Sequence, residues 1–171
     1  MNKETIMMYT IKSITYNHYI YNFTLYIIVM LYKVFNFKIS NMILKLVNKK
    51  VINIQLYRNK YNDIAYNEFL NKGKNIEFCN SLFKDNTFYD FKINNFPYNF
   101  DNNYKHYVLW VHPSLTININ FNEHIENIIV NHLKIIFKSY KKFYYFINAP
   151  SIKSIKNIQH IHVVIENPIF I

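Results

Sequence analysis

Two histidines placed one residue apart near the C-terminus are the residues of this chain best suited to chemistry. His160 and His162 open an apolar run that ends at Glu166. Because side chains alternate between the two faces of a strand, His160, His162 and Glu166 are expected on one face. Paired imidazoles can attack phosphorus, carry protons or bind a metal ion. This strand is therefore the candidate site, and the elements around it must position it.

Two earlier segments contain polar side chains that are expected to lie near these histidines. The run 105–111 is apolar on both faces and predicts a central strand, on which His106 shares a face with Trp110. His106 is either a ligand-facing group or a buried, hydrogen-bonded histidine. The run 143–148 ends in Asn148, and a loop containing Pro150 joins it to the last strand, 159–166. These strands would close one sheet.

The remaining periodicities predict helices that flank the sheet. Apolar residues recur at helical spacing over 43–54, 64–69, 76–83 and 125–136, and strict alternation over 89–93 predicts one more strand. Asn62 and Asp63 are expected to cap the second helix and Gly73 to end it, with Cys79 as a small core residue. Helices first, then strand, strand, helix, strand, strand, indicate an α+β domain with an antiparallel sheet.

Composition excludes several classes of protein. A single cysteine rules out an internal disulfide framework and any multi-cysteine zinc site, and fits a reducing, cytoplasmic compartment. A single glycine rules out glycine-rich phosphate loops. The net charge of +10 comes with scattered lysines and a residue usage typical of AT-rich coding sequence. A nucleic-acid partner is therefore not favoured, although a basic surface attracts polyanions in general.

The first forty-one residues read as an aromatic, apolar extension, and 42–171 as a single α+β domain. Residues 13–32 contain no Asp, Glu, Lys or Arg. Three interpretations stay open for this segment. It is a helix or strand packed on the domain, a membrane anchor that includes several polar residues, or extra reading frame before a true start at Met30 or Met42.

Two blocks of the chain resemble a known family. Asp90-Phe-Lys-Ile-Asn-Asn-Phe-Pro-Tyr98, followed by Lys105-His-Tyr-Val-Leu-Trp110, resembles the paired signatures of a family of unknown function that includes the fungal N-acetylglucosamine-induced protein 1. The segment from Phe146 to Val164 is similar to the family's second block, and 56–69 to its helical region, where an arginine precedes a helix. The resemblance spans about 42–168 and implies no stated activity.

The same order of residues is more distantly similar to the histidine-triad superfamily of nucleotide hydrolases and transferases. That resemblance implies a histidine-triad-like fold, with His162 as the nucleophile and His160 as the first histidine. It also matches His106, Asn148 and Ser154 to positions of the pattern. Together with Asn95 and Trp110, these are the candidate substrate-binding residues. The sequence departs from the pattern in two places: Val164 replaces the third histidine, and Ser154 lies six residues before His160.

Three functions therefore follow as hypotheses. The first is a domain that binds a phosphorylated nucleotide or nucleotide-sugar and transfers or hydrolyses it through His162. The second is a non-catalytic regulatory or interaction domain, motivated by Val164. The third is a metal-binding protein using His160, His162 and Glu166, whose spacing matches cupin-type sites but whose chain lacks the glycine-rich barrel composition of cupins. No cofactor or oligomeric state is assigned.

Overall fold

The computed structural model describes residues 18–35, 37–83, 87–115 and 123–171. The chain divides into two compact units, Met1–Phe37 and Lys38–Ile171, and each is considered by itself. The domain boundary expected between residues 41 and 42 stays a prediction.

The first unit contains helix α2, His18–Val34. Part of the uncharged segment 13–32 falls outside the described residues, and the part from residue 18 onward is helical. Among the helices that the structure describes, none combines the length and the apolar character needed to cross a lipid bilayer.

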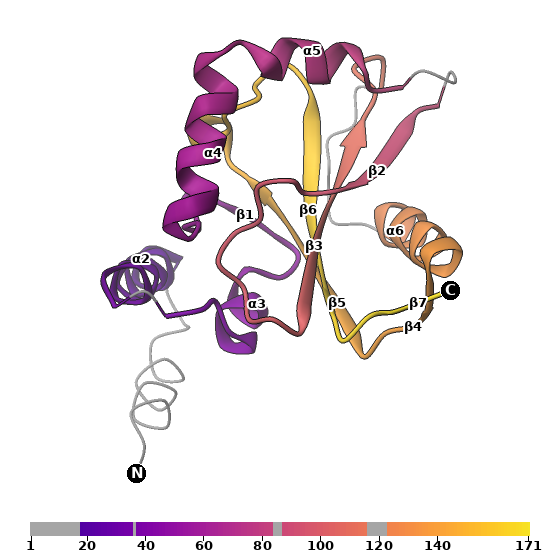
Figure 1. Cartoon of the computed structure of the whole chain (residues 1–171). Helices are drawn as coiled ribbons and strands as arrows, with labels where there is room; N and C mark the ends of the chain where they lie inside the picture. The colour runs from indigo at the N-terminus through magenta and orange to yellow at the C-terminus, as the bar shows by residue number, and fades with distance from the viewer. Residues whose placement is uncertain (1–17, 36, 84–86, 116–122) are drawn as a thin grey trace. The chain divides into compact units, whose positions relative to one another are not determined.

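The second unit is built on a five-stranded sheet in the order β1-β5-β6-β3-β2 (Figure 1). Its strands are β1 Lys50–Ile52, β2 Tyr89–Ile93, β3 Tyr104–Val111, β5 Lys142–Asn148 and β6 Gln159–Glu166. Strand β1 runs parallel to β5, and the other neighbours are antiparallel. The predicted α+β class is confirmed, with β6 at the centre of a mixed sheet.

Helices pack on the sheet because its two faces carry different sets of apolar residues. Helix α6, Glu123–Ile136, buries Ile125, Ile129 and Leu133 against one face, where they meet Ile161, Val163 and other apolar residues of the central strands. Toward the other face lie α4, Lys60–Asn71, and α5, Lys74–Asn80 (Figure 1). There α5 and the loop after it contact Val108 and Trp110. The candidate histidines lie on this second face.

The helix expected over 43–54 is shorter than predicted. Helix α3, Asn41–Val47, ends where Lys49 adopts a left-handed backbone with φ 57, and strand β1 follows. The apolar residues Val51 and Ile52 alternate along that strand instead of continuing a helical stripe. Sequence periodicity also missed β4, Phe137–Ser139, and β7, Ile169–Phe170, which pair in a separate two-stranded sheet.

Gly73 has φ 68 between α4 and α5, which agrees with its predicted role as a helix stop. The cap of α4 is Asn59, whose side chain accepts the Asn62 N–H, and not the expected Asn62 and Asp63. A short 3₁₀ helix, Pro150–Ile152, forms the loop between β5 and β6.

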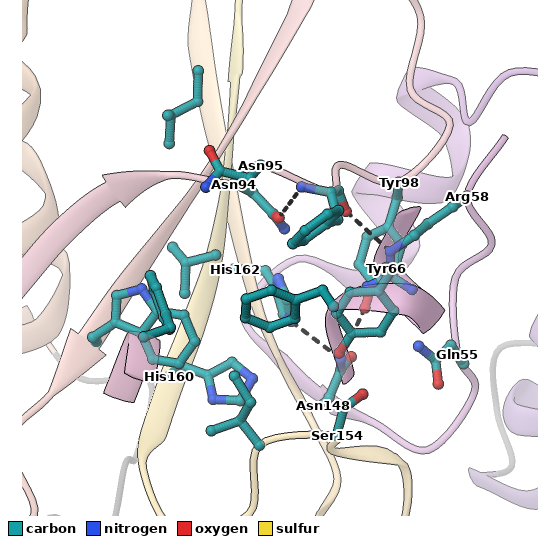
Figure 2. Close-up of a pocket in the computed structure, with 17 residues that line it drawn as sticks. Gln55, Arg58, Tyr66, Asn94, Asn95, Tyr98, Asn148, Ser154, His160 and His162 are labelled. Carbon is teal, nitrogen blue, oxygen red and sulfur yellow. Dashed lines mark hydrogen bonds between the residues drawn. The ribbon is translucent and has the colours of Figure 1, made fainter. Parts of the chain in front are cut away.

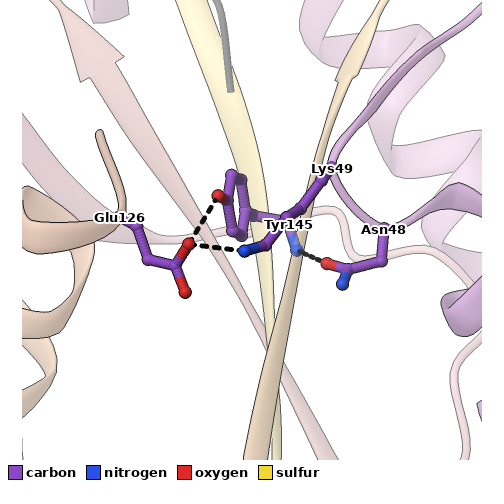
Figure 3. Close-up of polar contacts among 4 residues, drawn as sticks. All are labelled: Asn48, Lys49, Glu126 and Tyr145. Atoms are coloured by element: carbon purple, nitrogen blue, oxygen red, sulfur yellow. Dashed lines mark hydrogen bonds and ion pairs between the residues drawn. The ribbon is translucent and has the colours of Figure 1, made fainter. Parts of the chain in front are cut away.

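A polar clamp joins α6 to β5 and to the turn before β1 (Figure 3). The Lys49 ammonium lies 2.6 Å from Glu126 Oε2, and the hydroxyl of Tyr145 donates to the same carboxylate at 3.1 Å. Asn48 Oδ1 accepts the Tyr145 N–H at 3.0 Å, while Tyr145 O accepts the Lys49 N–H. The hydrogen bonds from Lys49 and then Tyr145 hold the pKa of Glu126 below its usual range. The clamp therefore links helix α6 to strand β5 and to the turn that precedes the edge strand β1.

Candidate functional site

A pocket opens on the sheet face that carries the histidines, and it encloses about 680 Å³ including its open mouth. It lies between β6, β3, β5, helices α4 and α5 and the loop after β2 (Figure 2). The residues that line it are Gln55, Arg58, Tyr66, Phe69, Phe78, Ile93, Asn94, Asn95, Phe96, Tyr98, Val108, Trp110, Asn148, Ser154, Ile155, His160 and His162.

Sheet register explains how residues distant in sequence meet here. His162 on the central strand is paired with Val108 on one side and Phe146 on the other. His106 lies two residues before Val108 and Asn148 two residues after Phe146, so both are diagonal neighbours of His162 on the same face. Diagonal neighbours are close enough for long side chains to touch. The register of the three strands therefore fixes this cluster.

His162 is the centre of a buried hydrogen-bonded row. Its Nδ1 lies 3.0 Å from His106 Nε2, and its Nε2 lies 3.1 Å from Asn148 Nδ2. Asn148 Nδ2 also lies 2.9 Å from the hydroxyl of Tyr98. Asn148 Oδ1 is buried and finds no hydrogen-bond partner among the described residues. The row therefore leaves one amide atom of a pocket-lining side chain without a partner.

Burial keeps these imidazoles neutral. It lowers the pKa of His106 to about 3, with a smaller contribution from the Arg58 charge. It lowers the pKa of His160 to about 4 and that of His162 well below its ordinary value, with smaller contributions from neighbouring charges. At neutral pH each ring therefore carries one proton and offers one donor and one acceptor.

His160 differs from His162 in its partners. Its Nδ1 lies 3.0 Å from the Ile158 carbonyl oxygen, which fixes the proton on Nδ1 and leaves Nε2 as an acceptor. The ring packs against Trp110 at 4.8 Å between centroids and edge-on to His162 at 5.4 Å. His160 is thus an oriented imidazole in the wall of the pocket.

Arg58 is the positive charge of the pocket. Its Nε donates to the Phe96 carbonyl at 3.0 Å, and its guanidinium lies 3.9 Å from the ring centre of Tyr66 and 4.9 Å from that of Tyr98. No Asp or Glu lines the pocket, and no carboxylate among the described residues pairs with Arg58. The guanidinium is therefore held in place with its charge uncompensated.

Aromatic side chains form one wall. Phe69 of α4 lies 5.1 Å from Phe96 and 6.3 Å from Phe78, and Phe78 of α5 lies 5.1 Å from Trp110, all between ring centroids. Tyr66 joins the row 5.4 Å from Phe96. Phe69, Phe78 and Phe96 are half-buried, so part of their surface is open to a flat molecule.

Most of the residues predicted for the site come together. The pocket is lined by His160, His162, Asn148, Trp110, Asn95 and Ser154, the last two of them exposed. His106 instead lies behind His162, is buried and hydrogen-bonded, and borders a second groove together with Asn94. The roles of these residues stay predictions.

The alternative metal set is not assembled. Glu166 is buried at the far end of β6, where it pairs with Lys141 at 2.7 Å and lies opposite Tyr104. Across the described ranges, no group of three or more His, Cys, Asp or Glu side chains is placed to hold a metal ion.

Sequence reasoning did not identify Arg58, which gives the pocket its charge, or Tyr98, which also lines it. Tyr98 stacks on His106, at 5.3 Å between ring centroids, and on Phe146, at 6.4 Å, and the sequence placed it only within the block that resembles a family signature. Only the family resemblance drew attention to Arg58, as the arginine that precedes a helix. One signal could have found it: Arg58 is the single arginine of a chain with 19 lysines among its 20 basic residues.

Comparisons with known proteins identify the family of this chain but no activity. Residues 30–166 match the model of a family described as "Protein of unknown function (DUF3605)". The chain belongs to this family. A solved structure described as "Crystal Structure of HTC1" is similar at 17% identity and a TM-score of 0.43, over 65% of this chain and 76% of that chain. Nothing matched among curated proteins. The resemblances to the N-acetylglucosamine-induced protein and to the histidine triad stay expectations.

Proposed function

We propose that this domain binds a small phosphorylated molecule that carries a planar ring, such as a nucleotide or a nucleotide-sugar. The observation that carries the proposal is Arg58, a fixed guanidinium facing an aromatic pocket without a lining carboxylate. An uncompensated charge in such surroundings favours an anionic ligand.

The fixed orientation of Arg58 supports phosphate recognition. The guanidinium uses its Nε–H on the Phe96 carbonyl oxygen, and its planar fork has five N–H donors in all. Donors that remain can bind two phosphate oxygens at once. Stacking on Tyr66 reduces the rotamer freedom that a surface arginine would lose on binding.

The aromatic wall supports recognition of the ring. Phe69 and Phe96 present half-buried rings beside the charged end of the pocket. Base-on-aromatic stacking typically contributes about 1–3 kcal/mol for each base. Small-molecule sites are largely apolar clefts with a few placed polar groups, and this pocket combines aromatic side chains with Arg58 and Asn148 in that way.

Transfer or hydrolysis through His162 is the finer hypothesis from the sequence, and the geometry supports it less than binding. A nucleophilic imidazole needs a ring nitrogen whose lone pair faces the substrate. Both nitrogens of His162 lie within hydrogen-bond distance of His106 and Asn148. Attack would first require the Asn148 amide to move. We therefore propose binding without turnover, which joins the ligand of the first hypothesis to the non-catalytic role of the second.

Calorimetric titration with AMP, adenosine and inorganic phosphate tests the proposal. AMP is expected to bind more tightly than adenosine or phosphate alone. Arg58→Met is expected to weaken AMP binding by about 10- to 100-fold, as for a lost charged hydrogen bond. Lys60→Met is the matched control, because it removes the same charge from an exposed residue outside the pocket.

Two results would overturn the proposal. One is wild-type protein that binds neither AMP nor UDP-glucose at millimolar concentration. The other is equal weakening of AMP binding by Arg58→Met and Lys60→Met, which would indicate general attraction to a basic surface. Release of phosphate or a transferred nucleotide from either compound, abolished by His162→Ala, would restore the catalytic hypothesis.

A further inference from the structure

The amide of Asn94 has a fixed orientation. Its Oδ1 accepts the Phe96 N–H at 2.9 Å, so its Nδ2 is the atom that faces the His106 ring, 3.3 Å from Nδ1 and 3.4 Å from Nε2. An amide nitrogen is only a donor. A proton on His106 Nδ1 would therefore meet this donor and no acceptor, whereas a proton on Nε2 finds Nδ1 of His162 at 3.0 Å, so the proton belongs on Nε2.

This proton fixes the next ring in the row. His106 Nε2–H donates to His162 Nδ1 at 3.0 Å, so Nδ1 of His162 is an acceptor. A neutral imidazole then has its proton on Nε2. His162 Nε2–H faces the amide atom of Asn148 at 3.1 Å, and that atom must be an acceptor.

Tyr98 requires the same arrangement. Its hydroxyl proton needs an acceptor because the side chain is buried. The atom 2.9 Å away is the same amide atom of Asn148. Amide oxygen and nitrogen differ little in shape and are assigned from their hydrogen bonds. Oxygen at this position accepts from both the Tyr98 hydroxyl and the His162 Nε2–H, whereas nitrogen is only a donor and would leave both of these protons without an acceptor.

We infer that Asn148 turns its amide oxygen toward Tyr98 and His162 and offers its NH₂ group to the pocket as a donor for a ligand oxyanion beside Arg58. This inference rests on the proposed function for its ligand, although the orientation of the amide does not. It assigns the amide atom that has no partner among the described residues to the ligand. Tyr98 connects the two binding groups, since its ring centre lies 4.9 Å from the Arg58 guanidinium and its hydroxyl is hydrogen-bonded to Asn148.

The inference gives His106 and His162 a positioning role. The row from Asn94 to Asn148 holds the Asn148 amide in one orientation through hydrogen bonds that do not themselves involve the ligand. An oxyanion would then receive N–H donors from Arg58 and Asn148 together. A ligand group that can only donate would meet two donors and bind poorly.

Histidine tautomers in the ligand-free, ¹⁵N-labelled protein test the orientation directly. Long-range ¹H–¹⁵N correlation spectra at pH 7 are expected to show His106 and His162 with the proton on Nε2, and His160 with the proton on Nδ1. Signals are assigned with His106→Gln and His160→Gln. A proton on Nδ1 of His162 would overturn the inference, whether or not AMP binds.

Binding of AMP to Asn148→Asp tests the ligand contact. The aspartate oxygens keep an acceptor for Tyr98 but place an acceptor and a charge where the NH₂ group was. AMP affinity is expected to fall by about 10- to 100-fold. Asn95→Asp is the matched control, with the same charge change on an exposed pocket residue, and should weaken binding less.

The outcomes separate this inference from the proposed function. Wild-type protein that shows the expected tautomers but binds neither AMP nor phosphate refutes the proposed function and the oxyanion contact, and leaves the amide orientation standing. AMP binding that Asn95→Asp and Asn148→Asp weaken equally refutes the oxyanion contact alone. A loss specific to Asn148→Asp with the expected tautomers supports both.

Discussion

Nε2 of His106 lies 3.0 Å from Nδ1 of His162, and both rings are buried on one face of the central sheet. The two histidines are 56 residues apart in sequence and meet because β3 and β6 are neighbouring antiparallel strands. One of the two nitrogens must carry the proton and donate it in the hydrogen bond, and the other must be the acceptor. This pair therefore transmits the hydrogen-bond direction set at Asn94 to the pocket at Asn148.

Acid is expected to destabilise this fold through its buried histidines. The folded-state pKa is about 3 for His106 and about 4 for His160, below the ordinary 6.5, so the unfolded chain binds protons first as the pH falls. Stability is fully present above pH 6.5 and declines as the pH falls toward 4. Each histidine contributes up to about 1.4 kcal/mol per pH unit in that window. Urea denaturation at several pH values between 6.5 and 5 measures the slope.

Substitution identifies the residue responsible. His160→Gln is expected to make the dependence of unfolding free energy on pH less steep by about one proton. His124→Gln, at an exposed position on α6, is the control and should leave the slope nearly unchanged. Equal slopes in the wild type and in His160→Gln would show that His160 is not held neutral by burial.

The clamp at Glu126 is expected to stabilise the fold mainly through Tyr145. Glu126→Ala removes the acceptor of a hydroxyl on a buried ring, and we expect a loss of about 1–2 kcal/mol in unfolding free energy. Glu126→Gln keeps an acceptor and loses only a half-exposed ion pair with Lys49, worth about 0.2–1 kcal/mol. Urea denaturation compares them with Glu68→Ala, which breaks an exposed pair with Lys72. Equal effects of Glu126→Ala and Glu68→Ala would contradict this account.

The aromatic wall is expected to recognise the ring of the ligand and not its phosphate. Phe69→Ala should weaken AMP binding by about fivefold or more, the lower end of a lost stacking contact. Binding of inorganic phosphate should change little, because Arg58 is untouched. Calorimetry with both ligands tests this, with Tyr61→Ala as the control on the exposed side of the same helix. Parallel loss of phosphate and AMP affinity would indicate damage to the fold.

Much of the scaffold follows from the sequence because its strands carry strong signals. The alternation in 89–93 and the apolar runs around His106 and His162 predicted three strands of the sheet, and the stripe from Ile125 to Ile136 predicted α6. Period-two spacing also placed His160 and His162 on one face, where both line the pocket. Local patterns of this kind depend on burial and are readable in a single chain.

Long-range geometry accounts for what the sequence did not reveal. Strand β1 has three residues and gains its stability from pairing with β5, so its pattern is too short to distinguish from the end of a helix. Arg58 and Tyr98 belong to segments without regular periodicity, and only the fold brings them beside Asn148. The direction of the hydrogen-bonded row depends on Asn94, whose turn has no sequence signal beyond a preference for Asn.

Trp110 provides the most direct test of the claim that this pocket binds a phosphorylated ring. It is the single tryptophan of the chain and lines the pocket against His160 and Phe78. With excitation selective for tryptophan, titration with AMP should change Trp110 emission and saturate at the concentration found by calorimetry. Calorimetric binding without any change in Trp110 emission would place the ligand elsewhere, and no response to AMP or UDP-glucose by either method would contradict the account.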